Sequence, residues 1–370
     1  MATEETTIAE HLSAAGYRTG MFGKWHLGDN YPFRPIDQGF DEAVRHEGGG
    51  IGQVGNIYNY FHFDSSYFDP YLLHNGQYEQ YEGFCSDIFT DEALRFIEEN
   101  KDGPFFTYLS YNAPHTPLQL PEKYVDMYDT VELNSNHYRE TGYPIGGIDD
   151  RSAKRVYGMV TNIDDNLQRV FDRMKELGIY DETIIIFMTD NGPQQRRYNS
   201  GLRDRKSSVY EGGTRVPFFV RYPEKFKADE EISTPAAHID VLPTLLDLIG
   251  LETADSLDGK SLIPLLSGDD RVFRERPIFT YWQRGFPEKY RNVAMRKGDY
   301  KFVGHTAYPW NAKEFELFNI KDDPAELFDI SEEAPELLAE LKGEFDAWFD
   351  EIIESPNLEP RRIVIGSEHD

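Results

Sequence analysis

The stretch YRTGMFGKWHLG, residues 17–28, joins an apolar run to a loop with two chemically active side chains. Its first six residues predict a β-strand, and the glycine-flanked segment that follows contains Lys24 and His26. Before this strand, residues 7–15 predict a short amphipathic helix that ends at a glycine. A helix and a strand in succession, with polar residues after the strand, are typical of an α/β protein.

The same alternation of helix and strand patterns continues along the chain. Residues 87–100 and 151–177 predict helices, residues 104–111 predict a buried strand, and the β-branched run at 183–188 predicts a central strand. Apolar residues that step by four and three indicate the longer helix, namely Val156, Val160, Ile163, Leu167, Val170 and Met174. The predicted fold class is therefore α/β, with a mixed, mostly parallel central sheet sandwiched by helices.

The pattern changes near residue 276. Short strand-like segments follow one another there and end at a helix predicted for residues 335–353. Strands in succession, without helices between them, favour an antiparallel sheet. We therefore divide the chain into an α/β domain at 1–275, a smaller antiparallel α+β subdomain at 276–354 and a tail at 355–370.

Two long segments, residues 41–86 and 118–150, are rich in tyrosine, asparagine, glycine and aspartate. We interpret both as long loops over one rim of the domain. The aromatic residues within 51–84 have two interpretations, because such side chains are suited both to stacking on a carbohydrate and to packing beneath a loop.

The composition excludes several classes of partner. The chain of 370 residues carries 66 acidic and 38 basic side chains, a formal net charge of −28, which argues against nucleic acid or an anionic membrane as the main partner. No apolar run approaches the roughly 20 residues of a membrane-spanning helix, and the first residues lack the pattern of a signal peptide. The single cysteine, Cys85, excludes a disulfide framework within the chain.

Side chains with anion-binding or metal-binding chemistry follow three of the predicted strands and precede a fourth. In open α/β sheets, ligands bind at the carboxyl ends of the strands, where the following loops converge. We therefore expect one crevice to contain Lys24, His26, His115, Asp190, Asn191 and Lys206.

This set of residues has a chemical logic. Asp190 and Asn191 offer a carboxylate and an amide oxygen, which a hard divalent cation prefers, although calcium takes roughly six to eight ligands. Lys24 and Lys206 can neutralise a tetrahedral oxyanion, and the two histidines can donate hydrogen bonds or move a proton near neutral pH. The target predicted by these residues is an anionic ester, of sulfate or of phosphate.

A local inversion of charge supports an anionic target. Residues 195–206, QRRYNSGLRDRK, contain five basic side chains and one acidic side chain within a very acidic protein. The alternative, an ordinary solvated loop, stays open because short runs of like charge usually lie at the surface.

Together these motifs resemble the sulfatase family of the alkaline-phosphatase superfamily. The matching segments occur in the family's order and extend over nearly the whole chain. They are TIAEHLSAAGYRTGMFGKWHLG (7–28), FTDEALRFIEE (89–99), APHTPL (113–118), TDNGP (189–193), KSSVYEGGTRVPFF (206–219), HIDVLPTLLDLIG (238–250), LDGKSLIPLL (257–266) and ELFNIKDDPAELFDI (316–330). The resemblance implies an alkaline-phosphatase-like fold and the hydrolysis of sulfate esters.

The resemblance also implies roles for individual residues. Asp190 and Asn191 would bind Ca²⁺, and Lys24 and Lys206 would hold the sulfate oxygens. The substrate would be a small-molecule or carbohydrate sulfate ester, and a sulfated polysaccharide is one candidate. The location of the full-length protein would be periplasmic or extracellular.

The two histidines have catalytic roles in this comparison. His115 would contact the sulfate and assist departure of the leaving group, and His26 would support the nucleophile. The loop after the first predicted strand would thus present one sulfate-holding cation and one imidazole that orients the nucleophile.

The chain departs from the family's pattern at the nucleophile. Sulfatases use a Cys or Ser in a Cys/Ser-x-Pro-x-Arg signature, which is converted to formylglycine, and an Asp-Asp pair completes their calcium shell. Both precede the segment similar to residues 7–15, and the only cysteine here, Cys85, lacks Pro and Arg at the required spacing and is interpreted as a small residue at a helix start. We therefore expect a fragment without the family's first strand, cut also within the tail at 355–370, and with little or no activity by itself.

Two alternatives stay open beside a sulfatase. One is a phosphodiesterase or phosphonate monoester hydrolase of the same superfamily, for which a metal shell rich in Asp and His would be expected. The other is a non-catalytic protein that binds sulfated glycans and has lost the chemistry.

Overall fold

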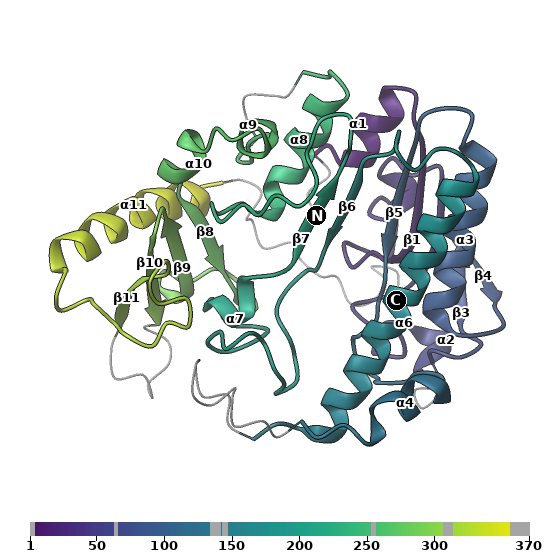
Figure 1. The fold of residues 1–370 in the computed structure, drawn as a ribbon, viewed down its shortest axis with the longest axis horizontal. Coiled ribbons are helices and arrows are strands. Elements are labelled where there is room, and N and C mark those ends of the chain that lie inside the picture. Colours follow the sequence, from purple (N-terminus) through teal and green to yellow (C-terminus); the bar gives the residue numbers. More distant parts are fainter. Residues whose placement is uncertain are drawn as a thin grey trace, which may run out of the picture. The chain divides into compact units, whose positions relative to one another are not determined.

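The computed structural model describes residues 4–62, 66–133, 142, 147–252, 257–305 and 314–355. The chain forms two compact units (Figure 1). The N-terminal unit comprises Met1–Leu133, Asp149–Ile185 and Tyr222–Lys225, and the C-terminal unit comprises Asn134–Ile148, Ile186–Arg221 and Phe226–Asp370. The predicted domain division at residue 275 stays a prediction, and all but the first residue of the predicted tail lies outside the described residues.

The N-terminal unit is built on a five-stranded sheet in the order β4-β3-β2-β1-β5. Strand β1 (Arg18–Lys24) pairs in parallel with both β2 (Glu42–His46) and β5 (Phe105–Ser110). Strands β3 (Tyr71–His74) and β4 (Gln77–Gln80) extend the sheet by antiparallel pairing. The carboxyl ends of β1, β2 and β5 therefore lie along one edge.

Helices cover both faces of this sheet. Helix α1 (Ile8–Ala14), which begins with a capping box at Thr7, contacts β1 on one face. Helix α3 (Cys85–Asn100) packs on β1 and β5, and α6 (Asp150–Glu176) packs on α3 (Figure 1). The predicted helices and the predicted mixed sheet sandwiched by helices are confirmed.

The two faces of β1 bury different side chains. Phe22 and its partner Val44 on β2 belong to the main core under α3, whereas Met21 and its partner Ala43 face α1. Side chains alternate between the faces of a strand. Because Lys24 is two residues after Phe22, it projects from the α3 face at the end of the strand.

The interpretation of residues 41–86 as a long loop is wrong, because this segment contains β2, β3, β4 and the short helix α2 (Ile57–Tyr60). Residues 118–150 likewise include α4 (Glu122–Asp129), which packs on α6. The sequence of β2 is largely polar, so it does not predict a strand. Pairing with β1, which is distant in sequence, supplies its hydrogen bonds.

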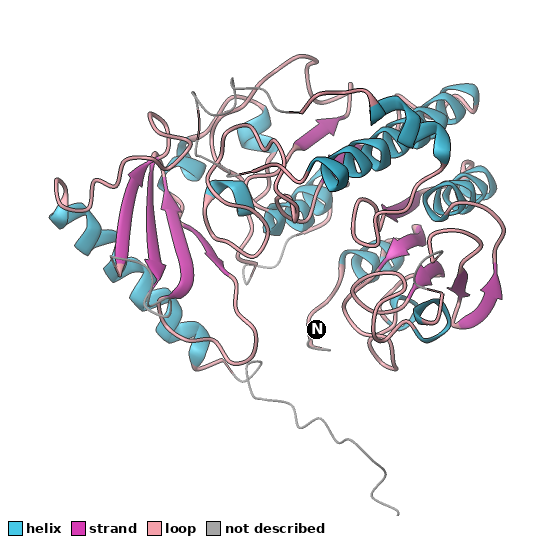
Figure 2. Cartoon of the chain, turned by 90° about the horizontal axis from the view of Figure 1, so that it is seen from below, coloured by secondary structure: helices cyan, strands magenta, loops and turns pink. Residues whose placement is uncertain are grey.

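The C-terminal unit contains the antiparallel sheet expected from residue 276 onward. Its order is β11-β10-β9-β8, with β8 (Ile278–Tyr281), β9 (Arg291–Lys297), β10 (Tyr300–His305) and β11 (Phe315–Asn319). Helix α11 (Pro335–Ile353) packs on β9 and β10 (Figure 2). The predicted α+β subdomain is confirmed.

Strands β6 (Ile185–Met188) and β7 (Phe218–Arg221) form a separate two-stranded sheet. The first residue of β6 is the last residue of a segment of the N-terminal unit. Within the described residues β6 pairs with β7 alone and is half-buried, so the expectation of a central strand at 183–188 is not met. The remaining elements are short: η1 (Pro35–Asp37), α7 (Glu211–Thr214), η3 (His238–Asp240), α8 (Val241–Leu248), α9 (Ile263–Leu266) and α10 (Arg271–Glu275). No helix within the described ranges has the length and apolar character needed to span a bilayer.

Candidate functional site

The first predicted site residues lie where β1 ends. Lys24 is the last residue of the strand and is half-buried, and His26 is exposed with a left-handed backbone conformation, φ +59°. The strand end is fixed to β5, because Ser110 Oγ donates a hydrogen bond of 2.8 Å to Lys24 O. A Cβ on Gly23 would lie 1.9 Å from Ser110 O, so only glycine fits between the two strands there.

Three consecutive glycines, Gly48 to Gly50, form a turn after β2 that contacts both predicted histidines. A Cβ on Gly49 would lie 2.6 Å from His26 Nε2, and a Cβ on Gly50 would lie 2.9 Å from His115 Nδ1. The structure therefore brings the two imidazoles against adjacent residues of one turn. The sequence signal for this turn is the GGG run itself, which lies within the segment interpreted as a loop.

His115 is held in one orientation by its neighbours. Its Nδ1 lies 2.8 Å from Thr116 O, and its main-chain oxygen accepts a hydrogen bond of 2.8 Å from the hydroxyl of the buried Tyr67. When Nδ1 donates its proton to a carbonyl, Nε2 is the nitrogen that accepts or releases a proton. The half-buried ring therefore has one defined position for proton transfer.

Sequence reasoning missed His46, the last residue of β2. It pairs with Lys24 in the sheet register and is 1% exposed. Its Nδ1 faces Glu47 O at 2.9 Å, and within the described residues its Nε2 has no hydrogen-bond partner. Burial lowers the pKa of His46 to about 4, and the nearby Lys24 ammonium also lowers it, so the ring is neutral beside that cation at pH 7.

An ion pair on the other face of β2 holds the glycine turn. Arg45 Nη1 lies 2.6 Å from Asp29 Oδ1, and Asp29 Oδ2 accepts a hydrogen bond of 3.1 Å from the Gly48 N–H. The Arg45 side chain is 4% exposed, so its charge is compensated by this carboxylate. The loop after β1 and the turn after β2 are thus joined by one carboxylate.

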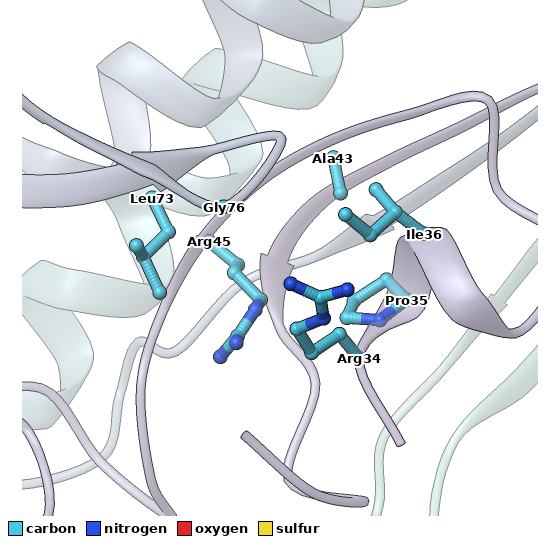
Figure 3. A pocket seen from close by; sticks show the side chains of 7 residues that line it. All are labelled: Arg34, Pro35, Ile36, Ala43, Arg45, Leu73 and Gly76. Carbon is cyan, nitrogen blue, oxygen red and sulfur yellow. The ribbon is translucent and has the colours of Figure 1, made fainter. Parts of the chain in front are cut away.

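A small pocket nearby is lined by Arg34, Pro35, Ile36, Ala43, Arg45, Leu73 and Gly76 (Figure 3). Its cations are paired, since Arg34 Nε lies 2.7 Å from Asp37 Oδ2 and Arg45 is paired with Asp29. None of the six predicted site residues lines it. We therefore assign no ligand to this pocket.

The aromatic residues of 51–84 divide between the two interpretations. Tyr67 is fully buried and Phe68 packs against the main core. Tyr58, by contrast, is 46% exposed and packs at a tilted angle against Tyr78, whose hydroxyl donates a hydrogen bond to Glu47. Packing therefore accounts for the first two residues, and the exposed rings beside the glycine turn keep the carbohydrate interpretation open.

In the C-terminal unit, the predicted metal ligands follow β6. Asp190 is exposed, and the half-buried Asn191 donates its Nδ2 proton to Gly192 O over 2.9 Å, so its amide oxygen is the group suited to a cation. The turn contacts the segment that carries Lys206, whose N–H donates a hydrogen bond of 2.9 Å to Pro193 O. The structure thus brings Asp190, Asn191 and Lys206 onto adjacent segments.

The chemistry of these oxygens fits a hard divalent cation, but two ligands make only part of a calcium shell. Within the described ranges, no group of three or more His, Cys, Asp or Glu side chains is arranged to hold a metal. The further ligands would have to come from other groups.

Part of the basic segment at 195–206 has a structural role. Arg203 lies over the Tyr210 ring at 3.8 Å and pairs with Glu316 at 3.2 Å. Arg205 donates a hydrogen bond of 3.1 Å to Gln194 O. The interpretation as an ordinary solvated loop is therefore wrong for Arg203, which anchors the segment to β11.

The six predicted residues thus form two half-sites of three residues each. The N-terminal half-site is Lys24, His26 and His115, and the C-terminal half-site is Asp190, Asn191 and Lys206. Their meeting in one crevice stays a prediction. Cys85 is the first residue of α3 and is buried, and burial raises its pKa, which confirms the interpretation as a helix-start residue.

Comparison with known proteins identifies the family. The Sulfatase family profile matches residues 1–251, and the profile "N-sulphoglucosamine sulphohydrolase, C-terminal" matches residues 200–349. An arylsulfatase of Clostridium perfringens is 27% identical over 94% of this chain and 80% of its own length. The uncharacterized sulfatase YdeN of Escherichia coli is 28% identical over 85% of this chain, which spans 56% of YdeN.

A solved structure gives the same result. The crystal structure of Ps i-CgsB is 29% identical, with a TM-score of 0.79, and the match covers 94% of this chain and 74% of that one. The resemblance inferred from the sequence motifs is confirmed. Because the Sulfatase profile covers more than half of the residues, the chain belongs to the sulfatase family.

Proposed function

We propose that this chain supplies the metal-binding and sulfate-binding residues of a calcium-dependent sulfuric-ester hydrolase. The observation that carries the proposal is the contact of His26 and His115 with one glycine turn beside Lys24. Sulfatases are generally metal-dependent hydrolases of sulfate esters. The alternative of a phosphonate hydrolase is not favoured, because the relatives identified from sequence are sulfatases.

Each half-site has a task in this proposal. Lys24 and Lys206 offset the charge of the sulfate oxygens, and Asp190 and Asn191 would hold Ca²⁺, which supplies further positive charge at those oxygens when bound. His115 donates a proton from Nε2 to the leaving oxygen, since its Nδ1 faces a carbonyl.

His26 is the second imidazole of the N-terminal half-site. We assign it the task of orienting the attacking group, as the resemblance to sulfatases implies, and its Nε2 edge lies against the glycine turn. The family's attacking group is formylglycine, and the Cys/Ser-x-Pro-x-Arg signature from which it is made is absent from residues 1–370. Hydrolysis by this polypeptide alone is therefore expected to stay at background.

The substrate we propose is a carbohydrate sulfate. Ps i-CgsB has also been solved in complex with k-i-k-neocarrahexaose, and this structure is 29% identical to the chain with a TM-score of 0.78. Tyr58 is exposed and contacts Tyr78, which lies next to the glycine turn. The ring of Tyr58 therefore offers a face on which a sugar ring can stack. A periplasmic or extracellular location agrees with such substrates and with a Drosophila melanogaster relative named extracellular sulfatase SULF-1 homolog.

Calorimetry tests this proposal. The chain should bind a sulfated oligosaccharide in the presence of CaCl₂ at least tenfold more tightly than the desulfated sugar. Lys24→Ala and His115→Ala should abolish this preference, whereas Lys225→Ala, an exposed lysine of the same unit, should preserve it. Equal binding of the sulfated and desulfated sugars would contradict the proposal.

The same preparation also tests the expected lack of turnover. Incubation with 4-nitrophenyl sulfate and CaCl₂ should release nitrophenol at the background rate. Release well above background that disappears in His115→Ala would show that the chain contains its own nucleophile.

A further inference from the structure

Three charged side chains meet in the interior of the C-terminal unit, where Lys301 of β10 donates a hydrogen bond to Glu211 of α7. Figure 1 shows α7 beside the antiparallel sheet. The side chains of Glu211, Lys301 and Glu326 are 5%, 4% and 0% exposed. Lys301 Nζ lies 2.9 Å from Glu211 Oε1 and 2.9 Å from Glu326 Oε1. Glu326 Oε2 accepts a hydrogen bond of 2.7 Å from the main-chain N–H of Glu211. We call these three residues the buried triad.

Stability alone does not explain the buried triad. Burying charges is costly, and apolar side chains of similar volume in place of a buried ion cluster are often neutral or stabilising. A second cation, Arg296, lies 3.4 Å from Glu211 Oε2. Glu326 also has a left-handed backbone conformation, φ +54°, which is unfavourable for residues other than glycine. These energetic costs indicate that the buried triad has a role other than stabilising the fold.

The buried triad is connected to the C-terminal half-site through α7. Gly212 donates its N–H to Arg203 O over 2.7 Å, and Gly192 donates its N–H to Gly213 O over 2.9 Å. A Cβ on Gly192 would lie 1.9 Å from Gly212 O. The turn after Asp190 is therefore in direct main-chain contact with α7, the helix that begins at the triad's Glu211.

The loop that carries Lys206 is tied to the same elements. It begins near Arg203, which accepts the hydrogen bond from Gly212 and pairs with Glu316 of β11. It returns to the turn after β6 at Lys206, whose N–H donates to Pro193 O over 2.9 Å. The antiparallel sheet therefore holds the loop at one side and the buried triad holds α7 at the other.

We propose that Lys301 and Glu326 are positioning residues for the C-terminal half-site. Through Glu211 they hold α7 against the antiparallel sheet, and α7 in turn places the turn of Asp190 and Asn191. The antiparallel subdomain thus fixes the position of the loops that carry the proposed metal-binding and anion-binding residues. This inference rests on the proposed function, because that function gives the half-site its ligands.

The test uses a variant that removes all three charges together, E211Q/K301M/E326Q, which keeps an amide oxygen for the main-chain N–H at position 211 and another beside Arg296. Its melting temperature should stay within a few degrees of that of the unchanged chain. Its affinity for Ca²⁺, measured by calorimetry with CaCl₂, should fall at least tenfold. Hydrogen exchange at the Gly192 and Lys206 amides, which donate the two main-chain hydrogen bonds of these loops, should become at least tenfold faster.

Two controls separate positioning from general stability. E326Q keeps an oxygen that accepts the Glu211 N–H, so it should retain the calcium affinity and the slow exchange. K297M/E344L removes a more exposed ion pair between β9 and α11 in the same subdomain and should also leave both unchanged.

The outcomes are distinct. A folded triad variant with unchanged calcium affinity and unchanged amide exchange overturns the inference. If that variant does not fold, K301Q/E326Q replaces it, and the same loss of affinity and protection is required. If the unchanged chain binds no Ca²⁺, the proposed function fails at this half-site. Faster exchange at Gly192 in the variant would then still support the positioning role, and unchanged exchange would overturn it.

Discussion

In the N-terminal half-site, two imidazoles lie against a glycine turn, whereas in the C-terminal half-site, main-chain hydrogen bonds and buried charges hold two loops together. The first arrangement depends on the volume left empty at Gly49 and Gly50. The second depends on the buried triad and on the close approach of Gly192 to Gly212. One protein therefore positions ligand-binding residues in two ways, and each way has its own weakness.

The largest effect is expected for Gly192→Ala. The new Cβ would lie 1.9 Å from Gly212 O, and a main-chain oxygen cannot rotate away as a side chain can. We expect loss of Ca²⁺ binding, with a destabilisation of about 1–3 kcal/mol from overpacking. Calorimetry and chemical denaturation measure the two effects. Gly343→Ala in α11, where a Cβ meets nothing within 4 Å, is the matched control.

Gly49→Ala should have the next largest effect, confined to the N-terminal half-site. A Cβ there would lie 2.6 Å from His26 Nε2, and the ring can move aside, so the fold should persist while the imidazole is displaced. Misplacement by about 1 Å can cost about 100-fold in activity, and we expect up to that loss in affinity for a sulfated oligosaccharide. Gly103→Ala, with open space around its Cβ, should bind normally. Normal binding by both variants would show that the turn does not position His26.

Acid should weaken the N-terminal unit through His46. Burial lowers its pKa to about 4, so the stability linked to its neutral form is fully present above pH 6.5 and is lost as the pH falls toward 4. His46→Gln, which cannot be protonated, should remove up to ~3 kcal/mol of this acid sensitivity. Denaturation at pH 7 and at pH 4.5 checks this, with the exposed His62→Gln as control. The expectation is wrong if H46Q remains as acid-sensitive as the unchanged chain.

The C-terminal unit should show an effect of similar size and opposite sign through Glu326. Burial raises its pKa to about 7, so the stability linked to its protonated form is fully present below about pH 4.5 and is lost as the pH rises through 7. Glu326→Gln resembles the protonated acid and should be more stable than the unchanged chain at pH 8 by up to ~3 kcal/mol. Melting curves at pH 5 and pH 8 measure it. A stabilisation that is the same at both pH values would assign the effect to packing and not to ionisation.

Much of the fold could be predicted from local patterns. The apolar spacing of the helix at 151–177 and the succession of strands after residue 276 correspond to α6 and to the antiparallel sheet. The strands around 41–86 could not be predicted in this way. Strand β2 has a polar sequence, EAVRH, and its hydrogen bonds come from β1, more than a dozen residues earlier in the chain.

The candidate site divides in the same way. Lys24 and Asp190 stand directly after strand patterns, so their places at strand ends followed from the sequence. His46 and the buried triad did not, because their importance comes from partners far away in sequence. Lys301, for example, donates a hydrogen bond to Glu211, which lies 90 positions earlier in the sequence.

The family, the α/β class and the chemical types of the six candidate residues follow from residue identity and local spacing. The folded chain was needed to show that Gly49 and Gly50 lie against His26 and His115, and that Lys301 joins two buried glutamates. The physical reason is that strand register and side-chain burial depend on contacts between distant segments, and such contacts leave no periodic signal in the sequence.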